Sequence, residues 1–383
     1  MQCFNDYNIK NVEYVKLYEK NPNMKKKSFS ISKNLKNGVY ATQNNIFNSF
    51  HYNLNKRFHH VLSPNNSILF STKDYDRLAR FLQGKRIGLV LGGGGARGIA
   101  HIGIIQALEE QGIPIDIVGG CSMGAFVGAL YCKECDNSLV FKETKKFSSK
   151  AKSILYFFLD LTYPLMSLFR GKYLNSIIKS SFKNTNIEHL WIEYFCISTN
   201  LYTNEEEIHS TGTIWKYLRA SMGLCGYVPP VCDEKGFLVD GGYLNNLPVD
   251  IMLKKDVYKI IAVDVGSKNY NDYDEHDECL NGFVGLVHKL LGVRKYITMQ
   301  EIQYRLAFLS SENKLKNINN NKNVFLIRPE LEGVNTMDFN KFDEIVACGY
   351  AYGKKVIEEW KKSGVYEKYF NQKKSIVRRR YSV

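Results

Sequence analysis

The sequence predicts an α/β fold in which a parallel sheet is covered by helices on both faces. The first observation is the order of the patterns: a buried-strand run at 86–91, a helical pattern at 100–111, a second strand at 114–118 and a helix from Ala125. This order is typical of parallel sheets whose connecting helices lie on the two faces. The second observation is that further strand and helix candidates follow in the rest of the chain.

The other elements are expected before and after this core. A helix is expected at 72–82, where Thr72 and Asp74 supply a capping pattern. Further strands are expected at 194–198, 237–239, 260–265 and 324–327, and further helices at 214–221, 249–254, 299–310 and 341–360. Residues 1–72 are polar, rich in Asn and Lys and weakly periodic, which predicts a partly disordered extension. One main domain at 73–362 and a basic C-terminal tail at 363–383 complete the chain.

Composition excludes several classes of protein. The 383 residues are 44% hydrophobic and 23% charged, which excludes a fully disordered, collagen-like or disulfide-scaffold chain. No run of about 18 apolar residues is present, so no membrane-spanning helix is expected. The N-terminus lacks a secretory signal, and the nine scattered cysteines are therefore expected to be reduced thiols in the cytoplasm. The net charge of +14 favours an anionic partner such as a membrane surface or a nucleic acid, or simply reflects a solvated arm.

The strongest chemical signal is the G-x-S-x-G pattern at 120–124, between a predicted strand and a predicted helix. Such a turn holds its serine in a strained conformation with the hydroxyl exposed above the sheet. Gly120 and Gly124 let the strand and the helix approach each other, so Ser122 is the candidate nucleophile. The alternative is a chance match in a turn. Ser221 lies in a similar pattern that lacks the first glycine, and we interpret it as structural.

The second signal is the glycine-rich loop at 92–98, again between a strand and a helix. Its uncovered backbone N–H groups could bind a phosphate or a developing oxyanion. A dinucleotide site would need an acidic residue at the end of the second strand, and Asp116 is inside that strand. A P-loop is excluded because no Gly-Lys-Ser/Thr follows. A glycine-rich loop beside a serine elbow fits acyl transfer better.

A nucleophile needs a base, and two aspartates follow predicted strands. Asp240 follows the strand at 237–239, and Asp264 follows 260–263. We favour Asp240 and keep Asp264 as its rival. A triad would need His276 or His288, and each is more simply a surface or interface residue, while His101 is expected to pack a helix. The isolated C-x-x-C at 132–135 does not predict a metal site.

The three motifs together resemble those of patatin-like phospholipases: 93–98, 120–124 and 240–242. The match is closer to the neuropathy target esterase branch, because 77–80, 87–91, 159–164, 240–248, 301–307 and 336–343 also resemble it. The resemblance covers about residues 73 to 360. Within it, Cys121 and Met123 stand where Thr and Ile are commoner.

The resemblance implies a three-layer α/β/α patatin-like fold with a mainly parallel sheet. It also implies a Ser–Asp dyad, with Ser122 as nucleophile and Asp240 as base, and an oxyanion hole from Gly93, Gly94 and Gly95, to which elbow geometry adds the Met123 N–H. Arg97, Gly98, Gly120, Gly124, Gly241 and Gly242 would support these motifs.

The implied activity is hydrolysis of acyl esters in lysophospholipids and phospholipids without a metal or other cofactor. The expected partners are that lipid substrate and a membrane surface, contacted peripherally from the cytoplasm through the apolar stretches 154–159 and 283–291; no nucleic acid is expected. Lys150, Lys152, Arg170 and Lys172 could meet anionic headgroups. The alternatives are an acyltransferase or triacylglycerol lipase on the same dyad, and a non-catalytic lipid- or nucleotide-binding module.

Overall fold

The computed structural model describes residues 72–152, 158–266, 273–275, 278–318 and 321–371, together with the backbone of four short strands nearer the N-terminus. These strands are β1 (Tyr14–Glu19), β2 (Phe29–Ser30), β3 (Thr42–Gln43) and β4 (Arg57–Leu62). β1 pairs with β4 and β2 pairs with β3. The rest of the predicted extension, and residues 372–383 of the predicted tail at 363–383, lie outside the described residues.

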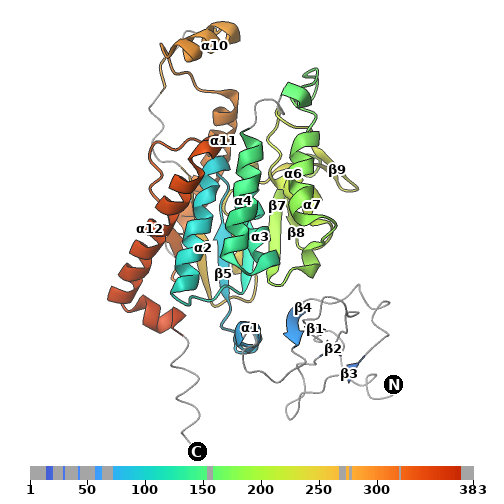
Figure 1. The fold of residues 1–383 in the computed structure, drawn as a ribbon, viewed down its shortest axis with the longest axis vertical. Coiled ribbons are helices and arrows are strands. Elements are labelled where there is room, and N and C mark those ends of the chain that lie inside the picture. The colour runs from blue at the N-terminus through green and yellow to red at the C-terminus, as the bar shows by residue number, and fades with distance from the viewer. Residues whose placement is uncertain are drawn as a thin grey trace, which may run out of the picture.

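The centre of the molecule is an eight-stranded mixed sheet (Figure 1). Its strands are β5 (Ile87–Leu91), β6 (Ile117–Gly120), β7 (Glu193–Asn200), β8 (Glu205–His209), β9 (Val231–Asp233), β10 (Gly236–Asp240), β11 (Lys259–Val263) and β12 (Val324–Ile327). The strand order is β12-β11-β5-β6-β7-β10-β9, and β8 also pairs with β7. In this order, the five strands from β12 to β7 run parallel to one another. β8, β9 and β10 run antiparallel to their neighbours.

The described helices are α1 (Thr72–Leu82), α2 (Ala100–Glu110), α3 (Ser122–Glu134), α4 (Asn137–Ala151), α6 (Lys172–Phe182), α7 (Ile214–Ser221), α8 (Gly242–Asn245), α9 (Val249–Leu253), α10 (Gly282–Leu291), α11 (Met299–Ile318) and α12 (Phe342–Lys362). Helices cover both faces of the sheet, whereas α1 and α10 lie at opposite ends of the molecule (Figure 1). Short 3-10 turns cover Gly95–Ile99 (η3), Ile187–His189 (η4) and Phe339–Lys341 (η5), and a π-helical turn covers Tyr366–Phe370 (η6).

Two apolar clusters lie on opposite faces of the sheet, because successive strand side chains point to opposite sides. Leu89 and Leu91 belong to the larger cluster, which the helices α2, α3, α4 and α12 share. Val90 belongs to the smaller cluster, together with residues of α9. Figure 1 shows α2, α4 and α12 in front of the sheet. The predicted three-layer α/β/α fold with a mainly parallel sheet is therefore confirmed.

Most predicted elements are present with shifted ends. β6 begins three residues later than expected and continues through Gly120, because backbone pairing of Leu91 with Gly120 needs no apolar side chain. α3 begins at Ser122 rather than at Ala125. α4, α6, β8 and β9 were not predicted from the sequence patterns. α4 is mostly polar, and it buries only Val140, Thr144, Phe147 and Ser148, at helical spacing.

Candidate functional site

The serine elbow lies between β6 and α3, as the G-x-S-x-G pattern predicts. Ser122 has φ +50°, a left-handed conformation that costs an ordinary residue about 1–2 kcal/mol. A Cβ on Gly124 would lie 2.2 Å from the Leu91 carbonyl oxygen, so only glycine lets α3 approach β5 this closely. The Ser122 backbone N–H donates to the Ser221 hydroxyl over 3.0 Å. Ser221 therefore holds the elbow from α7, a structural role that the sequence pattern left unspecified.

Asp240 ends β10 and lies beside the elbow. Its backbone pairs with Ser198 of β7, and β10 is antiparallel, so Asp240 does not reach the site from the carboxyl edge of a parallel strand. Its Oδ1 accepts from the Gly242 N–H at 2.8 Å and from the Cys121 thiol at 3.8 Å. Its buried Oδ2 has no hydrogen-bond partner within the described parts of the chain.

Burial raises the pKa of Asp240 to about 7, and the Gly242 N–H, the Ser122 hydroxyl and the Cys121 thiol oppose that rise only in part. The Ser122 hydroxyl is thus near enough to influence the carboxyl without closing a hydrogen bond to Oδ2. In substrate-free enzymes, hydrogen bonds between catalytic groups are often long or poorly aligned, and they tighten when a substrate binds. A carboxylate with this pKa is half ionised near neutral pH and can accept a proton there.

The glycine-rich loop packs directly on the elbow. A Cβ on Gly93 would lie 3.0 Å from the Ser122 Cβ and 2.5 Å from the Asn246 Oδ1. The Gly93 N–H donates to the Asn246 carbonyl at 3.3 Å. The N–H groups of Gly94, Gly95 and Met123 have no acceptor among the residues that the structure describes. These three N–H groups are therefore available as hydrogen-bond donors close to the elbow.

Arg97 fixes the far side of this loop. Its buried guanidinium donates to the carbonyl oxygens of Val265, Gly266, Leu331 and Val334, at 2.7 to 3.2 Å. The Ala96 N–H donates to the Thr336 carbonyl at 2.8 Å. The arginine of the predicted motif is therefore a loop anchor that ties the glycines to the segments after β11 and β12.

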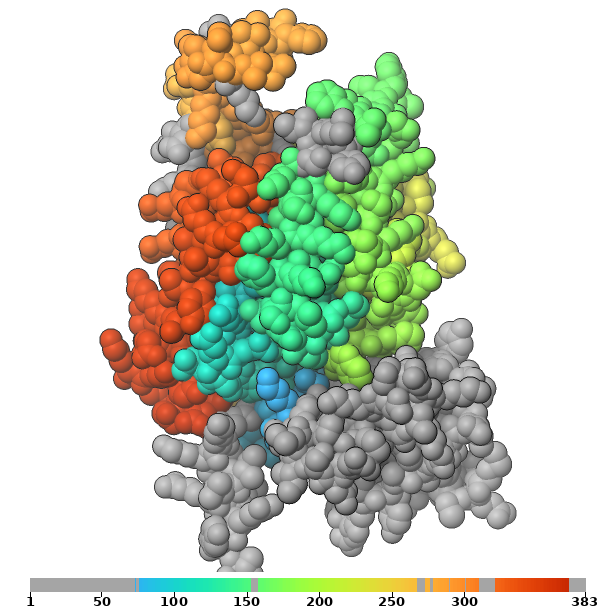
Figure 2. Space-filling view, in the orientation of Figure 1, coloured from blue at the N-terminus to red at the C-terminus, as the bar shows by residue number. Residues whose placement is uncertain are grey.

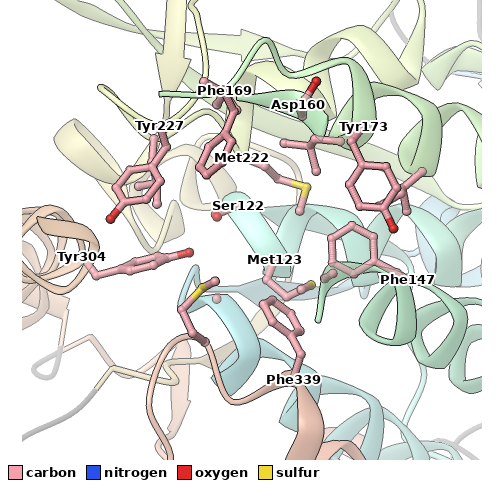
Figure 3. Close-up of a pocket in the computed structure, with 17 residues that line it drawn as sticks. Ser122, Met123, Phe147, Asp160, Phe169, Tyr173, Met222, Tyr227, Tyr304 and Phe339 are labelled. Carbon is pink, nitrogen blue, oxygen red and sulfur yellow. The ribbon is translucent and has the colours of Figure 1, made fainter. Parts of the chain in front are cut away.

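An apolar cavity of about 330 Å³ opens over Ser122 (Figure 3). Its walls come from α4, α6, α11 and the segments 222–228 and 337–339, and Asp160 is the one ionisable carboxylate among its lining residues. The lining residues are Gly95, Ser122, Met123, Phe147, Ala151, Asp160, Phe169, Tyr173, Leu174, Ile177, Met222, Leu224, Tyr227, Val228, Tyr304, Met337 and Phe339. The Asp160 Oδ2 accepts from the Gly171 N–H at 2.9 Å, which holds the start of α6. The cavity suits one long apolar group near the Ser122 hydroxyl.

The rival base and the candidate histidines lie elsewhere. The Asp264 carboxylate forms an ion pair with Arg328 at 2.5 Å and accepts from the Gly266 N–H at 2.9 Å. His288 is on α10, where its Nδ1 contacts the Tyr296 hydroxyl at 2.9 Å. His276 lies outside the described residues. Buried His101 contacts the Gly92 carbonyl through Nε2 at 2.8 Å, so it holds the loop as well as packing a helix.

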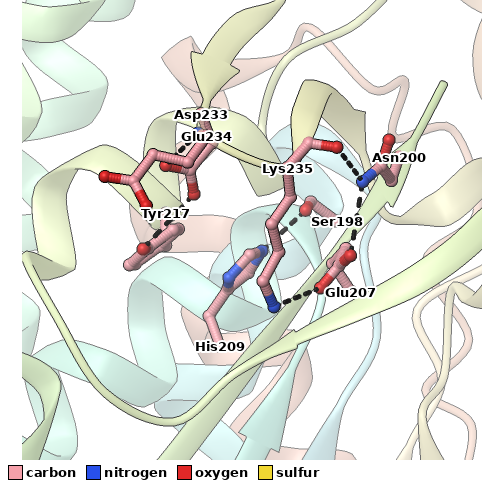
Figure 4. A network of polar contacts seen from close by, with 8 residues as sticks. All are labelled: Ser198, Asn200, Glu207, His209, Tyr217, Asp233, Glu234 and Lys235. Carbon is pink, nitrogen blue, oxygen red and sulfur yellow. Dashed lines mark hydrogen bonds and ion pairs between the residues drawn. The ribbon is translucent and has the colours of Figure 1, made fainter. Parts of the chain in front are cut away.

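A serine–histidine pair separate from the elbow lies inside the sheet (Figure 4). The Ser198 hydroxyl contacts the His209 Nε2 at 2.7 Å, and the His209 ring stacks on Tyr217 with centroids 4.1 Å apart. Burial lowers the pKa of His209 to about 4, so the ring is neutral. Ser198 is fully buried, which leaves no access for a substrate, and the pair is part of the core.

Two exposed apolar segments lie at the end of the molecule opposite α1 (Figures 1 and 2). In the first, Tyr163 is 84% exposed, and Phe158, Leu159, Leu165 and Met166 are also exposed. In the second, α10 exposes Phe283 at 82% and also Leu286, Leu290 and Leu291. Residues 154–157 of the predicted first stretch lie outside the described residues. Where these stretches are described, their large apolar side chains are mostly on the surface.

None of the helices in the described ranges is long and apolar enough to cross a membrane. The same residues contain no group of three or more His, Cys, Asp or Glu side chains arranged to hold a metal ion.

Comparisons with known proteins agree with the motifs. A family model described as patatin-like phospholipase matches residues 89–253. Lysophospholipase nte1 of Aspergillus fumigatus is 45% identical over 294 residues, which are 76% of this chain and 19% of that protein. Patatin-like phospholipase domain-containing protein 7 of Mus musculus is 42% identical over 312 residues, 80% of this chain and 23% of that protein.

The chain thus spans about a fifth of the length of these curated relatives. Among solved structures, VipD from Legionella pneumophila is similar with 15% identity and a TM-score of 0.39, over 72% of this chain and 67% of that one. The family model and the curated relatives together show that the chain contains a domain of the patatin-like phospholipase family.

Proposed function

We propose that residues 73–362 form a serine hydrolase domain that cleaves acyl esters of phospholipids, with Ser122 and Asp240 as a catalytic dyad. The observation that carries the proposal is a buried carboxyl with a pKa near 7 beside a serine held at positive φ at the floor of an apolar cavity. Perturbed acids next to a candidate nucleophile are typical of active sites.

The reaction would proceed in two steps. The Ser122 Oγ attacks the ester carbonyl carbon while its proton moves to the Asp240 Oδ2, and the negative charge develops on the former carbonyl oxygen. Collapse of this intermediate breaks the ester bond, and Asp240 returns the proton to the departing glycerol oxygen. Water then attacks the acyl-Ser122 ester with Asp240 again as base, which releases the fatty acid and the free serine.

Three N–H groups would bind the oxyanion. Among the described residues, the N–H groups of Gly94, Gly95 and Met123 have no acceptor, whereas the Gly93 N–H donates to the Asn246 carbonyl. We therefore assign Gly93 to contact with the elbow rather than to oxyanion binding. Donors of this kind typically contribute about 10²–10³-fold each to the rate.

An active-site-directed organophosphonate tests this proposal. It should label the purified protein at Ser122, because only an activated serine displaces the leaving group from phosphorus. A non-catalytic lipid- or nucleotide-binding module would remain unlabelled. Transfer of the acyl group to an added alcohol in preference to water would identify an acyltransferase instead.

We predict faster cleavage of lysophospholipids than of two-chain phospholipids or triacylglycerol. The cavity of about 330 Å³ is near the lower limit of typical ligand pockets, at roughly 300 Å³, and its apolar lining suits one acyl chain. Each CH₂ that leaves the membrane must regain about 0.8 kcal/mol inside. The measurement is kcat/KM for a lysophosphatidylcholine, its diacyl parent and a triacylglycerol in one detergent. Equal or greater efficiency on the larger lipids would contradict a single-chain site.

We further propose that the exposed segment 158–166 and α10 bring the cavity to a membrane surface. Burying their apolar side chains in the lipid interface would be favourable, and the exposed Lys152, Arg170 and Lys172 near the first segment would attract anionic headgroups. This placement would let a lipid reach Ser122 without crossing water.

Flotation with phosphatidylserine-containing vesicles checks this placement. The wild type should float and dissociate at high salt, because screening weakens the lysine and arginine contacts. The double variant Phe283→Ser/Leu290→Ser should float several-fold less than the wild type. The control variant is Leu139→Ser, which changes an exposed leucine near the start of α4, at the end of that helix away from the segment 158–166. This control should float like the wild type. Failure of the wild type to float, or its retention in membranes after alkaline carbonate, would reject peripheral binding.

A further inference from the structure

The glycine-rich loop is held peptide by peptide. In the peptide between Gly92 and Gly93, the carbonyl oxygen accepts a hydrogen bond from the His101 Nε2 at 2.8 Å. The N–H of the same peptide donates to the Asn246 carbonyl at 3.3 Å. In the next peptide, the Gly93 carbonyl oxygen accepts a hydrogen bond from the Asn246 Nδ2 at 3.1 Å. Asn246 therefore bonds both polar groups of Gly93, one through its backbone and one through its side chain.

The geometry of a trans peptide links this clamp to the oxyanion donors. The carbonyl and the N–H of one trans peptide point in opposite directions, and the described residues contain no cis peptide. A hydrogen bond that fixes the Gly93 carbonyl therefore also fixes the direction of the Gly94 N–H. Gly94 lies between Gly93, which packs on Ser122, and Gly95, which lines the cavity. Its N–H has no acceptor in the described parts of the chain.

We propose that Asn246 is a positioning residue whose side-chain amide aims the Gly94 N–H at the oxyanion formed during attack by Ser122. The inference rests on the proposed function and extends it to a residue outside the dyad and the donors. Asn246 follows α8, six residues after Asp240, so one short segment places the base and also orients the oxyanion loop.

The chemistry of the contact requires an amide. The Gly93 carbonyl can only accept, so it needs the N–H donors of the Asn246 Nδ2. A carboxylate in the same place would put a second acceptor against the carbonyl and push the peptide away. Asn246 is 3% exposed, so water has little access to replace a lost donor.

The test compares Asn246→Ala and Asn246→Asp with Asn245→Ala. Asn245 is a matched control because it is buried next in sequence and its Nδ2 donates to Glu206 and Asp250, away from the loop. For each variant we would measure kcat and KM on a short-chain ester, the rate of organophosphonate labelling, the pH dependence of kcat and the melting temperature. Asn246→Asp covers the case in which Asn246→Ala does not fold.

For both Asn246 variants we expect kcat and the labelling rate to fall about 10²-fold or more, as for a lost oxyanion donor. KM should stay within about twofold in both variants, because the cavity is unchanged. The acid limb of the pH profile should stay in place in Asn246→Ala, because no charge is added near Asp240. In Asn246→Asp the acid limb should move to higher pH, because a Cβ on Gly242 would lie 3.1 Å from both the Asn246 Oδ1 and the Asp240 Oδ1, so the new carboxylate would be close to Asp240. Asn245→Ala should keep wild-type kcat and labelling.

The inference is overturned if Asn246→Asp and Asn246→Ala lose no more kcat than Asn245→Ala, if the loss appears in KM, or if Asn246→Ala shifts the acid limb without lowering the maximal kcat. Any of these results with a wild type that is active and labelled at Ser122 leaves the proposed function standing. A wild type that is neither active nor labelled would overturn both.

Discussion

Replacing Ser122 by alanine should abolish lipid hydrolysis and organophosphonate labelling, with a loss of at least about 10³-fold in kcat/KM. The variant lacks the oxygen that forms the acyl-enzyme, while the cavity and the oxyanion donors remain. The melting temperature should stay close to that of the wild type, because the Ser122 N–H still donates to the Ser221 hydroxyl. The measurement is hydrolysis of a lysophosphatidylcholine by purified protein, beside thermal unfolding.

Ser198→Ala is the matched control for this experiment. Ser198 is also buried, lies on a neighbouring strand and contacts His209, so it tests whether the Ser198–His209 pair has any part in the reaction. We expect near wild-type hydrolysis in this variant. Full activity in Ser122→Ala, or loss of labelling only in Ser198→Ala, would place the nucleophile elsewhere.

The elbow could be predicted from the sequence because its physics is local. A strand that ends in Gly-x-Ser-x-Gly before a helix leaves few conformations, and the observed φ of +50° at Ser122 is the strain that such a turn requires. The parallel strands β5 and β6 were predictable for a similar reason, since buried apolar runs alternated with a helical pattern. The boundary of β6 was not, because its last residues are glycines held by backbone pairing alone.

The parts that could not be predicted depend on contacts between distant segments. The direction of β10 is set by its pairing with β7, and nothing within residues 236–240 distinguishes a parallel from an antiparallel strand. The acceptor for the Gly93 N–H is the Asn246 backbone carbonyl, 153 residues away. Ser221 looked like a structural serine in a helix, and only the fold brings its hydroxyl to the Ser122 N–H.

The sequence favours Asp240 over Asp264, and the structure adds a physical difference between the two carboxylates. Both follow apolar strands, and both accept a hydrogen bond from the N–H two residues later. Arg328 forms an ion pair with Asp264, whereas the buried Asp240 Oδ2 beside the elbow has no hydrogen-bond partner among the residues that the structure describes. The difference lies in what the rest of the chain brings to each carboxylate.

Asp240→Asn should reduce kcat/KM by at least about 10³-fold, because an amide cannot accept the Ser122 proton. In the wild type, kcat/KM should fall about tenfold for each pH unit below about 7, since attack needs the ionised carboxylate and burial raises the pKa of Asp240 to about 7. The measurements are a pH profile of the wild type and single-pH kinetics of the variant. Asp264→Asn should retain an acid limb near pH 7.

The same variant has a predicted effect on stability with a definite sign. A carboxyl whose pKa is raised by folding stabilises the folded state below its unfolded pKa, about 3.9, and this contribution is lost as pH rises through about 7. Above pH 7, burying the charged carboxylate costs about 4 kcal/mol. This value follows because folding raises the pKa of Asp240 by about three units, and each unit corresponds to about 1.36 kcal/mol. Asp240→Asn has no charge to bury and avoids this penalty.

The variant should therefore melt at a higher temperature than the wild type at pH 8, and this difference should shrink as the pH is lowered toward 5. Loss of activity together with a gain in stability at high pH would identify Asp240 as a base kept in its buried place at a cost to the fold. Two results would contradict this assignment: a wild-type activity that does not change between pH 5 and 8, or an Asp264→Asn variant that is inactive while Asp240→Asn still hydrolyses the ester.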